Sequence, residues 1–263
     1  MQVPRLIHQI YLQGDLPERL KEQVGLLKQR NPNWEHRLYD LQSGEDLIRN
    51  HFGARTLKAL MAINPDYGAA RADLMRHLIL HQFGGVYLDI KSDLVRPLDE
   101  VVRPDDEYLL SQWRNAPGQL HEGFGLHPEL SHIPGGEFQT YFLIGRKRHP
   151  FSKAAIEAIT SNILHYRPWS GVGKMGVIRT TGPSAYTLAV HPILHTAAYR
   201  MVSEDEVGAR MSINNYAHQD VFKRHYSVLT SPVARLAYPS RMLQLLIERL
   251  RQAKYDLQES KQL

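Results

Sequence analysis

The sequence predicts an α/β fold in which a mostly parallel sheet is flanked by helices. Over the first hundred residues, short segments rich in β-branched and aromatic residues alternate with longer segments of helical periodicity. Such alternation is typical of βαβ units, whose helices connect parallel strands. The 263 residues are 43% hydrophobic and 22% charged, which are ordinary globular values and exclude a disordered chain.

The elements of the N-terminal part follow one another at regular spacing. We expect a strand over residues 6–12, a helix over 17–30, a second strand over 34–39, and a short helix that begins at Ser43 and ends near Gly53. The most regular helical pattern covers residues 66–83. Gly84 and Gly85 end this helix, because glycine adopts the left-handed conformation readily. A short buried strand is expected at 86–90.

The C-terminal part carries weaker periodicity. We expect strands at 107–113 and 138–145, a glycine-rich loop at 118–136 and a helix at 151–164. Residues 240–258 have the pattern of an amphipathic helix whose polar face is basic. No long linker or internal repeat divides the chain, so we expect one domain.

The charge balance limits the classes of partner. The chain has a net charge of +5 and no cysteine, which excludes disulfides and thiolate metal sites. The basic run at 146–149 has no interleaved aromatic residues, so we predict no nucleic-acid partner. The basic tail either lies on an anionic membrane surface or packs back on the core. Because no apolar run could span a bilayer and no signal-peptide pattern is present, we expect a cytoplasmic protein.

Charged residues gather around the double glycine. Asp73, Arg76 and His77 are three and four residues apart, so they share one face of the predicted helix. Asp89 lies at the carboxyl end of the predicted strand, at the edge where α/β sheets bind their ligands. An arginine fork suits a phosphate, and a carboxylate can accept sugar hydroxyls or hold a divalent metal. The alternative is an ordinary helix–turn–strand unit with a surface ion pair.

Four motifs occur in order along the chain. They are PRLIHQIY at residues 4–11, ADLMR at 72–76, FGGVYLD at 83–89 and HP at 149–150. In order and spacing they resemble glycosyltransferase family 32, whose sugar-binding region contains a DxD motif. The resemblance implies a GT-A fold with a mixed, mostly parallel sheet, a nucleotide-sugar donor (a UDP-sugar favoured), retention of configuration at the anomeric carbon, and a Mn²⁺ or Mg²⁺ cofactor.

The resemblance also implies roles for particular residues. Asp73 would hold hydroxyls of the donor sugar, Arg76 the sugar phosphate, and Asp89 is the first aspartate of DxD. Tyr11 stands where the family places an aromatic residue against the base, since stacking needs only a flat π face. His225, in a late loop, is a candidate metal ligand. The implied nucleotide-sugar-binding residues are Gln9, Ile10, Tyr11, Asp73, Arg76, Gly85, Tyr87 and Asp89.

Lys91 departs from the motif, because it replaces the second aspartate of DxD, usually the direct metal ligand. If the strand continues, Lys91 shares a face with Asp89, and Asp93 lies about 13 Å from Asp89. Three alternatives follow. Lys91 itself neutralises the diphosphate without a metal, a bend at Ser92 brings Asp93 to a metal held by Asp89, or the protein binds a nucleotide sugar without turnover.

We therefore expect one domain, 1–263, that acts as a retaining glycosyltransferase with Asp73, Arg76, Asp89 and Lys91 as catalytic candidates. Residues 1–100 form the nucleotide-sugar-binding half, 101–239 the acceptor side with the late loops, and 240–263 the amphipathic basic helix, through which peripheral membrane contact is possible. The acceptor is expected to be a glycan or lipid-linked hydroxyl, in surface polysaccharide synthesis. The alternative is a catalytically degenerate nucleotide-sugar-binding or scaffold protein of a polysaccharide-assembly complex.

Overall fold

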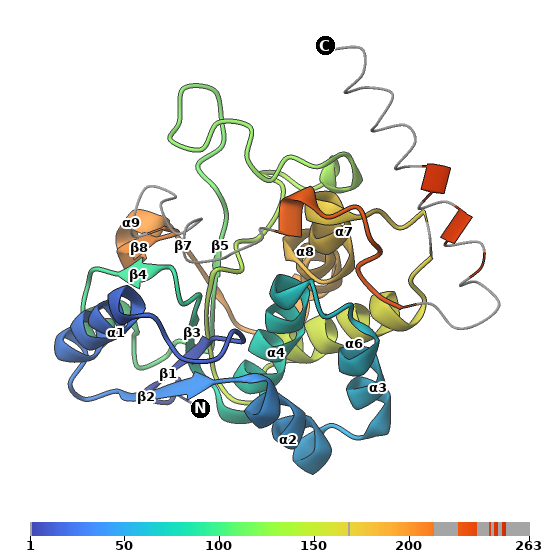
Figure 1. The fold of residues 1–263 in the computed structure, drawn as a ribbon. Helices are drawn as coiled ribbons and strands as arrows, with labels where there is room; N and C mark the ends of the chain where they lie inside the picture. Colours follow the sequence, from blue (N-terminus) through green and yellow to red (C-terminus); the bar gives the residue numbers. More distant parts are fainter. Residues whose placement is uncertain are drawn as a thin grey trace, which may run out of the picture.

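The computed structural model describes residues 2–167, 169–212 and 226–235, together with residues 242, 245, 246, 249 and 250. Its main sheet has six strands in the order β2-β1-β3-β6-β5-β7 (Figure 1). All run parallel except β6, which is antiparallel to both neighbours, so the prediction of a mixed, mostly parallel sheet is confirmed. The strands are β1 (Leu6–Ile10), β2 (Glu35–Tyr39), β3 (Gly85–Leu88), β5 (Tyr108–Ser111), β6 (Phe142–Gly145) and β7 (Arg200–Val202).

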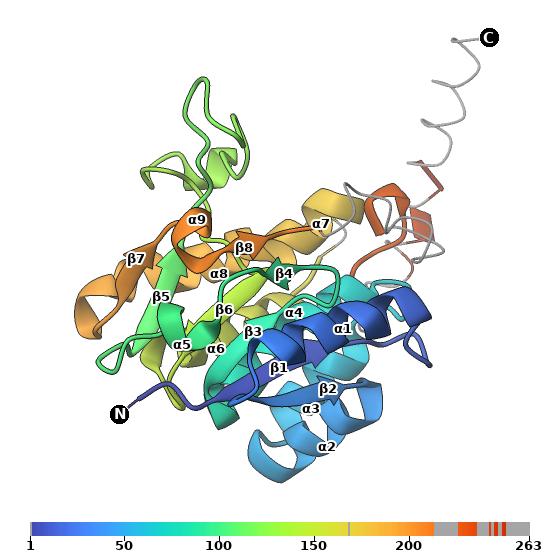
Figure 2. The ribbon, with the colours of Figure 1, turned by 90° about the vertical axis from the view of Figure 1, so that its left-hand side faces the viewer.

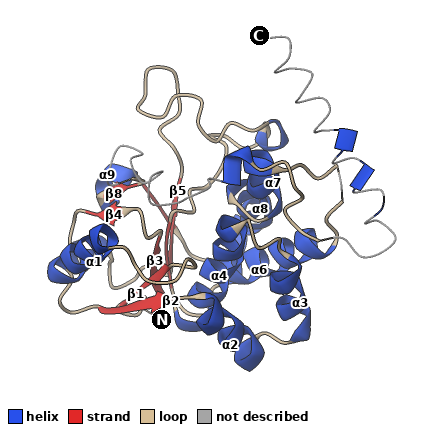
Figure 3. Cartoon of the chain, viewed as in Figure 1, coloured by secondary structure: helices blue, strands red, loops and turns tan. Residues whose placement is uncertain are grey.

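Helices cover both faces of this sheet, which lies between them as a middle layer (Figures 2 and 3). The larger core packs one face against α2 (Leu41–His51), α3 (Ala54–Ala62), α4 (Gly68–Phe83), α6 (Pro150–Leu164), α7 (Gly173–Thr180) and α8 (Pro183–Val190). The smaller core packs the other face against α1 (Glu18–Arg30), α5 (Leu98–Val101), α9 (Glu204–Val207) and a two-stranded sheet of β4 (Asp93–Leu94) and β8 (Ala209–Arg210). Within the described residues, no helix combines the length and apolar character needed to cross a bilayer.

Helix α4 runs through the larger core, and its burial differs from the expected one-sided pattern. Side chains all around the helix from Asp73 to Leu80 are buried. His77 is among them, and its ring stacks on that of Tyr186 with the centroids 5.0 Å apart. Gly84 ends the helix with a φ of 67°, as predicted. A Cβ at this position would lie 2.5 Å from the amide nitrogen of Lys147, so both space and conformation require glycine.

Two element boundaries differ from the prediction for local reasons. Helix α2 is capped by Asp40, whose carboxylate accepts from the amide of Ser43 while the Ser43 hydroxyl accepts from the amide of Asp40. Ser43 is therefore the third residue of the helix and not its cap. Strand β3 ends at Leu88, because the amide of Ser92 donates to the carbonyl of Asp89 and closes a turn. Most of the predicted helix at 240–258 lies outside the described residues.

The antiparallel strand β6 brings its amino end to the edge of the sheet where β1, β3 and β5 end. Residues 139–141, which precede β6, are held at this edge by backbone hydrogen bonds. The amide of Gln139 donates to the carbonyl of Ser111 over 2.8 Å, and the amide of Asp89 donates to the carbonyl of Tyr141 over 2.8 Å. We call this side of the sheet the carboxyl edge, and the candidate site lies along it.

Candidate active site

Three of the predicted residues come together at the carboxyl edge. Asp73 and Arg76 lie one turn apart on α4, and Asp89 follows the end of β3. The Arg76 Nη2 atom lies 2.8 Å from the Asp73 Oδ1 and 3.4 Å from the Asp89 Oδ1. One guanidinium therefore bridges two carboxylates that are sixteen residues apart in the chain. Asp73 and Arg76 are each only 6% exposed, so this is not the surface ion pair of the alternative interpretation.

The Arg76 guanidinium is held on more than one side. Its Nη1 donates to the carbonyl of Thr140 over 2.5 Å, and its plane lies 4.9 Å from the centre of the Tyr87 ring. A planar group with several fixed partners loses little freedom when it binds another. In this structure Arg76 therefore orients the two carboxylates, and its contact with a sugar phosphate stays a prediction.

The Asp73 carboxylate has a second partner in Thr181, whose hydroxyl donates to Oδ2 over 2.8 Å. Burial raises the pKa of Asp73, while the charge of Arg76, the hydrogen bond from Thr181 and the ammonium of Lys91 oppose that rise. Thr181 lies directly between α7 and α8, and Pro183 occupies the first turn of α8. The segment 181–183 thus opens a helix and also contacts the site.

The Asp89 carboxylate accepts a hydrogen bond of 2.7 Å from the hydroxyl of Tyr87. Burial raises the pKa of the Tyr87 hydroxyl well above its usual value, so Tyr87 stays a donor at any working pH. This tyrosine was predicted to bind the nucleotide sugar. The structure gives it two contacts within the site, a ring under Arg76 and a hydroxyl on Asp89.

Lys91 and Asp93 do not lie on an extended strand with Asp89, contrary to the geometric premise of the sequence prediction. The chain turns after Leu88, and Lys91 is part of that turn. A bend near Ser92 is therefore present, but Asp93 is directed elsewhere. Its Oδ1 lies 2.9 Å from the Nη1 of Arg30 on α1, and it also accepts from the amide of Leu94. Asp93 holds α1 against β4, and the structure does not bring it to Asp89.

The described residues do not provide a complete set of metal ligands. Within them, no group of three or more His, Asp or Glu side chains is arranged to hold an ion. Asp89 offers one carboxylate, already bonded to Tyr87 and Arg76, and the next position of DxD is a lysine. These groups do not fit a metal held by the protein alone. His225, the remaining candidate ligand, lies outside the described residues.

The predicted base-contact residues on β1 are largely committed to the fold. Gln9 is buried and its amide oxygen lies 2.9 Å from the Nε2 of His36. Ile10 belongs to the larger core. Tyr11 follows β1 at the carboxyl edge and packs in a small apolar cluster with Ile90. Gly85 allows β1 to approach, because a Cβ there would lie 2.6 Å from the carbonyl oxygen of Leu6. Contacts of these residues with a nucleotide sugar stay predictions.

The order of the strands and the helices on both faces define the class of fold, which is that of GT-A glycosyltransferase domains. The UDP-bound glycosyltransferase domain from the YGT toxin aligns with a TM-score of 0.54, over 99% of this chain and 91% of that chain. The two sequences are 9% identical, so the likeness concerns the fold.

Residues 17–109 match the model of a family described as the glycosyltransferase sugar-binding region containing a DXD motif. The resemblance predicted from the motifs is confirmed. The chain is 29% identical over 184 residues to mannosyl phosphorylinositol ceramide synthase SUR1 of Saccharomyces cerevisiae, and 20% identical over 195 residues to mannosyl phosphorylinositol ceramide synthase CSH1 of the same organism. The alignments cover 69% and 71% of this chain but only 40% and 49% of the two yeast proteins. The chain thus spans less than half the length of these relatives.

Proposed function

We propose that this protein is a retaining glycosyltransferase that moves a hexosyl group from a nucleotide sugar to a hydroxyl of a lipid-linked or glycan acceptor. The observation that carries the proposal is the Asp73–Arg76–Asp89 arrangement, with Asp73 and Arg76 buried, at the carboxyl edge of a GT-A fold. The two yeast relatives are named for a mannosylated ceramide lipid, which supports a lipid acceptor and a mannosyl group. The UDP in the toxin domain supports a uridine nucleotide.

The chemistry demands that the charge of a departing diphosphate be offset. The bond between the anomeric carbon and the phosphate oxygen breaks, and the acceptor oxygen attacks from the same face. The proton of the acceptor hydroxyl passes to an oxygen of the leaving phosphate. In this proposal Asp73 accepts hydroxyls of the donor sugar, and Arg76 holds Asp73 and Asp89 in place. Cations aimed at the developing charge lower the barrier because they need no reorganisation.

Lys91 supplies the missing positive charge in this proposal. The two aspartates carry two negative charges and Arg76 one positive charge, so the buried group has a net charge of −1 before Lys91 is counted. With Lys91 the sum is zero, and a bound diphosphate meets no net repulsion. An aspartate at position 91 would instead bring the sum to −2, which a divalent cation would be needed to neutralise. The lysine that this chain carries at position 91 therefore favours the alternative in which transfer needs no metal.

The experiment has a binding arm and a turnover arm. Thermal unfolding of the full chain is followed with a panel of nucleotide sugars, each with Mn²⁺ and with a chelator. Release of the free nucleotide is then measured with water or a lipid-linked hydroxyl as acceptor. We expect binding and turnover to persist in chelator, and we expect D73N and D89N to lose turnover while the exposed-site control D66N keeps it. Turnover by D73N or by D89N at a rate near that of the wild-type chain refutes the assignment.

The same experiment tests the second candidate, a nucleotide-sugar-binding protein without turnover. The observation that favours this candidate is again Lys91, which removes a residue that the motif normally uses for catalysis. A donor that raises the unfolding temperature but releases no nucleotide under any metal condition would support it. Full activity in chelator would exclude it, and would also exclude a metal-bound Asp93.

A further inference from the structure

The connection between β5 and β6 leaves the body of the protein. Gln112 and Phe138 form an antiparallel bridge at its base, and we call residues 113–137 the β5–β6 loop. Figures 1 and 2, seen from directions 90° apart, both show part of this loop projecting beyond the sheet and the helices, while the rest lies against them. It rises from the carboxyl edge, next to the segment that holds Asp89 and Arg76. The loop is therefore a projection beside the candidate active site.

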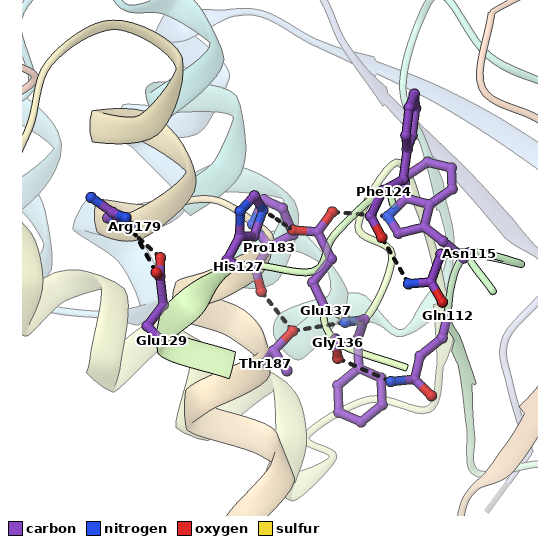
Figure 4. Close-up of polar contacts among 12 residues, drawn as sticks. Gln112, Asn115, Phe124, His127, Glu129, Gly136, Glu137, Arg179, Pro183 and Thr187 are labelled. Atoms are coloured by element: carbon purple, nitrogen blue, oxygen red, sulfur yellow. Dashed lines mark hydrogen bonds and ion pairs between the residues drawn. The ribbon is translucent and has the colours of Figure 1, made fainter. Parts of the chain in front are cut away.

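Hydrogen bonds inside the loop give it a defined shape (Figure 4). The Gln112 amide donates to the carbonyl of Gly136 over 3.0 Å. The Asn115 amide donates to the carbonyl of Phe124 over 2.7 Å and to that of Gly135 over 2.9 Å, so it ties the outgoing strand of the loop to the returning one. These contacts hold the backbone of the loop in a defined path.

The base of the loop is also fixed to the helices. The buried Glu137 accepts from the indole nitrogen of Trp113 over 2.8 Å and lies 3.0 Å from the Nε2 of His127. The amide of Phe138 donates to the hydroxyl of Thr187 on α8 over 2.8 Å. The loop therefore moves with the site and not independently of it.

The loop exposes three apolar side chains and offers no unpaired lysine or arginine side chain. Leu120 is 70% exposed, Phe124 45% and Leu126 54%, although all three lie within seven residues. The loop contains no lysine. Arg114 pairs with Asp205 and Glu129 with Arg179, and Glu137 has the partners described above. The exposed Glu122 accepts from the amide of Gly118 and keeps its negative charge.

We propose that the apolar tip of the β5–β6 loop, Leu120, Phe124 and Leu126, inserts into the apolar boundary of a lipid bilayer and so holds the active site at the headgroups. A convex projection cannot enclose a glycan, whereas it can enter a bilayer. The loop contains no lysine and its one arginine is paired with Asp205, so it offers nothing to a polyanion, and the hydrophobic effect supplies the attraction. The proposal rests on the proposed function only for the lipid acceptor, and it differs from contact through the basic tail, which would need anionic lipid.

Flotation of the full chain with vesicles tests the tip directly. One set of vesicles is pure phosphatidylcholine and the other also contains phosphatidylserine. The test variant is L120S/F124S/L126S, and the matched control is L26S/L38S/M61S, which removes three comparably exposed apolar side chains from α1, β2 and α3. We expect the wild-type chain and the control to float with neutral vesicles. The affinity of the loop variant for these vesicles should be lower by about tenfold or more. Thermal unfolding confirms that both variants fold.

The outcomes separate this proposal from the enzymatic one. If the wild-type chain stays unbound, binds anionic vesicles only, or loses binding equally in both variants, the proposal is overturned. Concentration-dependent dimerisation that the loop variant abolishes, without vesicle binding, would assign the tip to a second copy of the chain and also overturn it. Nucleotide release with water as acceptor should be equal in the wild-type chain and the loop variant. If neither releases nucleotide from any donor, the enzymatic assignment fails while the flotation result stands.

Discussion

Replacement of Thr181 by valine isolates one hydrogen bond of the buried site. Valine keeps the shape of threonine but removes the hydroxyl that donates to the Oδ2 of Asp73 over 2.8 Å. Asp73 is 6% exposed, so water cannot replace the lost donor easily. A hydrogen bond to a charged group contributes about 1.5–3 kcal/mol, and we expect T181V to lose about that much free energy of unfolding. For a domain of this length the loss corresponds to a decrease of about 3–10 °C in Tm.

The dependence of this loss on pH follows from the charge of Asp73. The Thr181 hydroxyl lowers the pKa of Asp73, so its removal raises that pKa further. The loss applies to the charged carboxylate, and it should therefore be largest at neutral pH and shrink as acid protonates Asp73. Transfer activity should decrease with it, because Asp73 is less often charged and less well oriented.

Urea denaturation of T181V and T160V, followed by circular dichroism, measures the effect. Thr160 on α6 is equally buried, but within the described residues its hydroxyl has no hydrogen-bond partner, so T160V should be neutral or slightly stabilising. Equal losses in the two variants would mean that the Thr181–Asp73 bond contributes nothing specific, and the reasoning would be refuted.

Three further predictions concern charge at and near the site. K91A should lower kcat/KM about 10²–10³-fold, which is the effect of losing one preorganised charge-stabilising group. K91D should make turnover depend on Mn²⁺. Steady-state assays with and without chelator measure both effects, and turnover of K91D without metal would contradict the charge argument. R30M should lose about 1–3 kcal/mol in urea denaturation, because it leaves the buried Asp93 carboxylate unpaired; an unchanged midpoint would show that the pair is not structural. Burial lowers the pKa of His8 to about 4 and of His77 to about 3, so the unfolded chain binds more protons below pH 6.5. Each of these two histidines should lower the free energy of unfolding by about 2 kcal/mol at pH 5. A free energy of unfolding that stays constant between pH 7 and pH 5 would be inconsistent with both lowered pKa values.

The parts of the fold with strong local signals were predictable. Helix α4 and its stop at Gly84 follow from helical periodicity and from the conformational freedom of glycine. The direction of β6 was not predictable, because the residue pattern of a strand does not indicate whether it runs parallel or antiparallel to its neighbours after a long loop. The cap of α2 was misplaced by three residues because Asp40 and Ser43 cap the helix together, and either residue alone has the pattern of a cap.

The site was predictable where side-chain type carries the chemistry. Asp73, Arg76 and Asp89 were expected from their spacing and do come together. The role of Thr140 was missed, since it contributes a backbone carbonyl, which every residue has. Asp93 has its partner, Arg30, on an element sixty-three residues earlier in the chain. Long-range pairing of this kind leaves no trace in local spacing, so an acidic residue near the motif resembled a metal ligand.

The two chain ends of the β5–β6 loop meet at one edge of the sheet because β6 runs against its neighbours, and Gln112 and Phe138 close the base as a bridge. A parallel β6 would have required a crossover connection back to the edge where β5 begins. Here the intervening segment can lengthen or shorten without a change of strand register, and each doubling of its length costs only about 0.6 kcal/mol in closure entropy. The length and sequence of this segment can therefore change while the residues of α4 and β3 stay in place. Insertion or deletion within this one segment changes what stands beside the candidate site without changing the site itself.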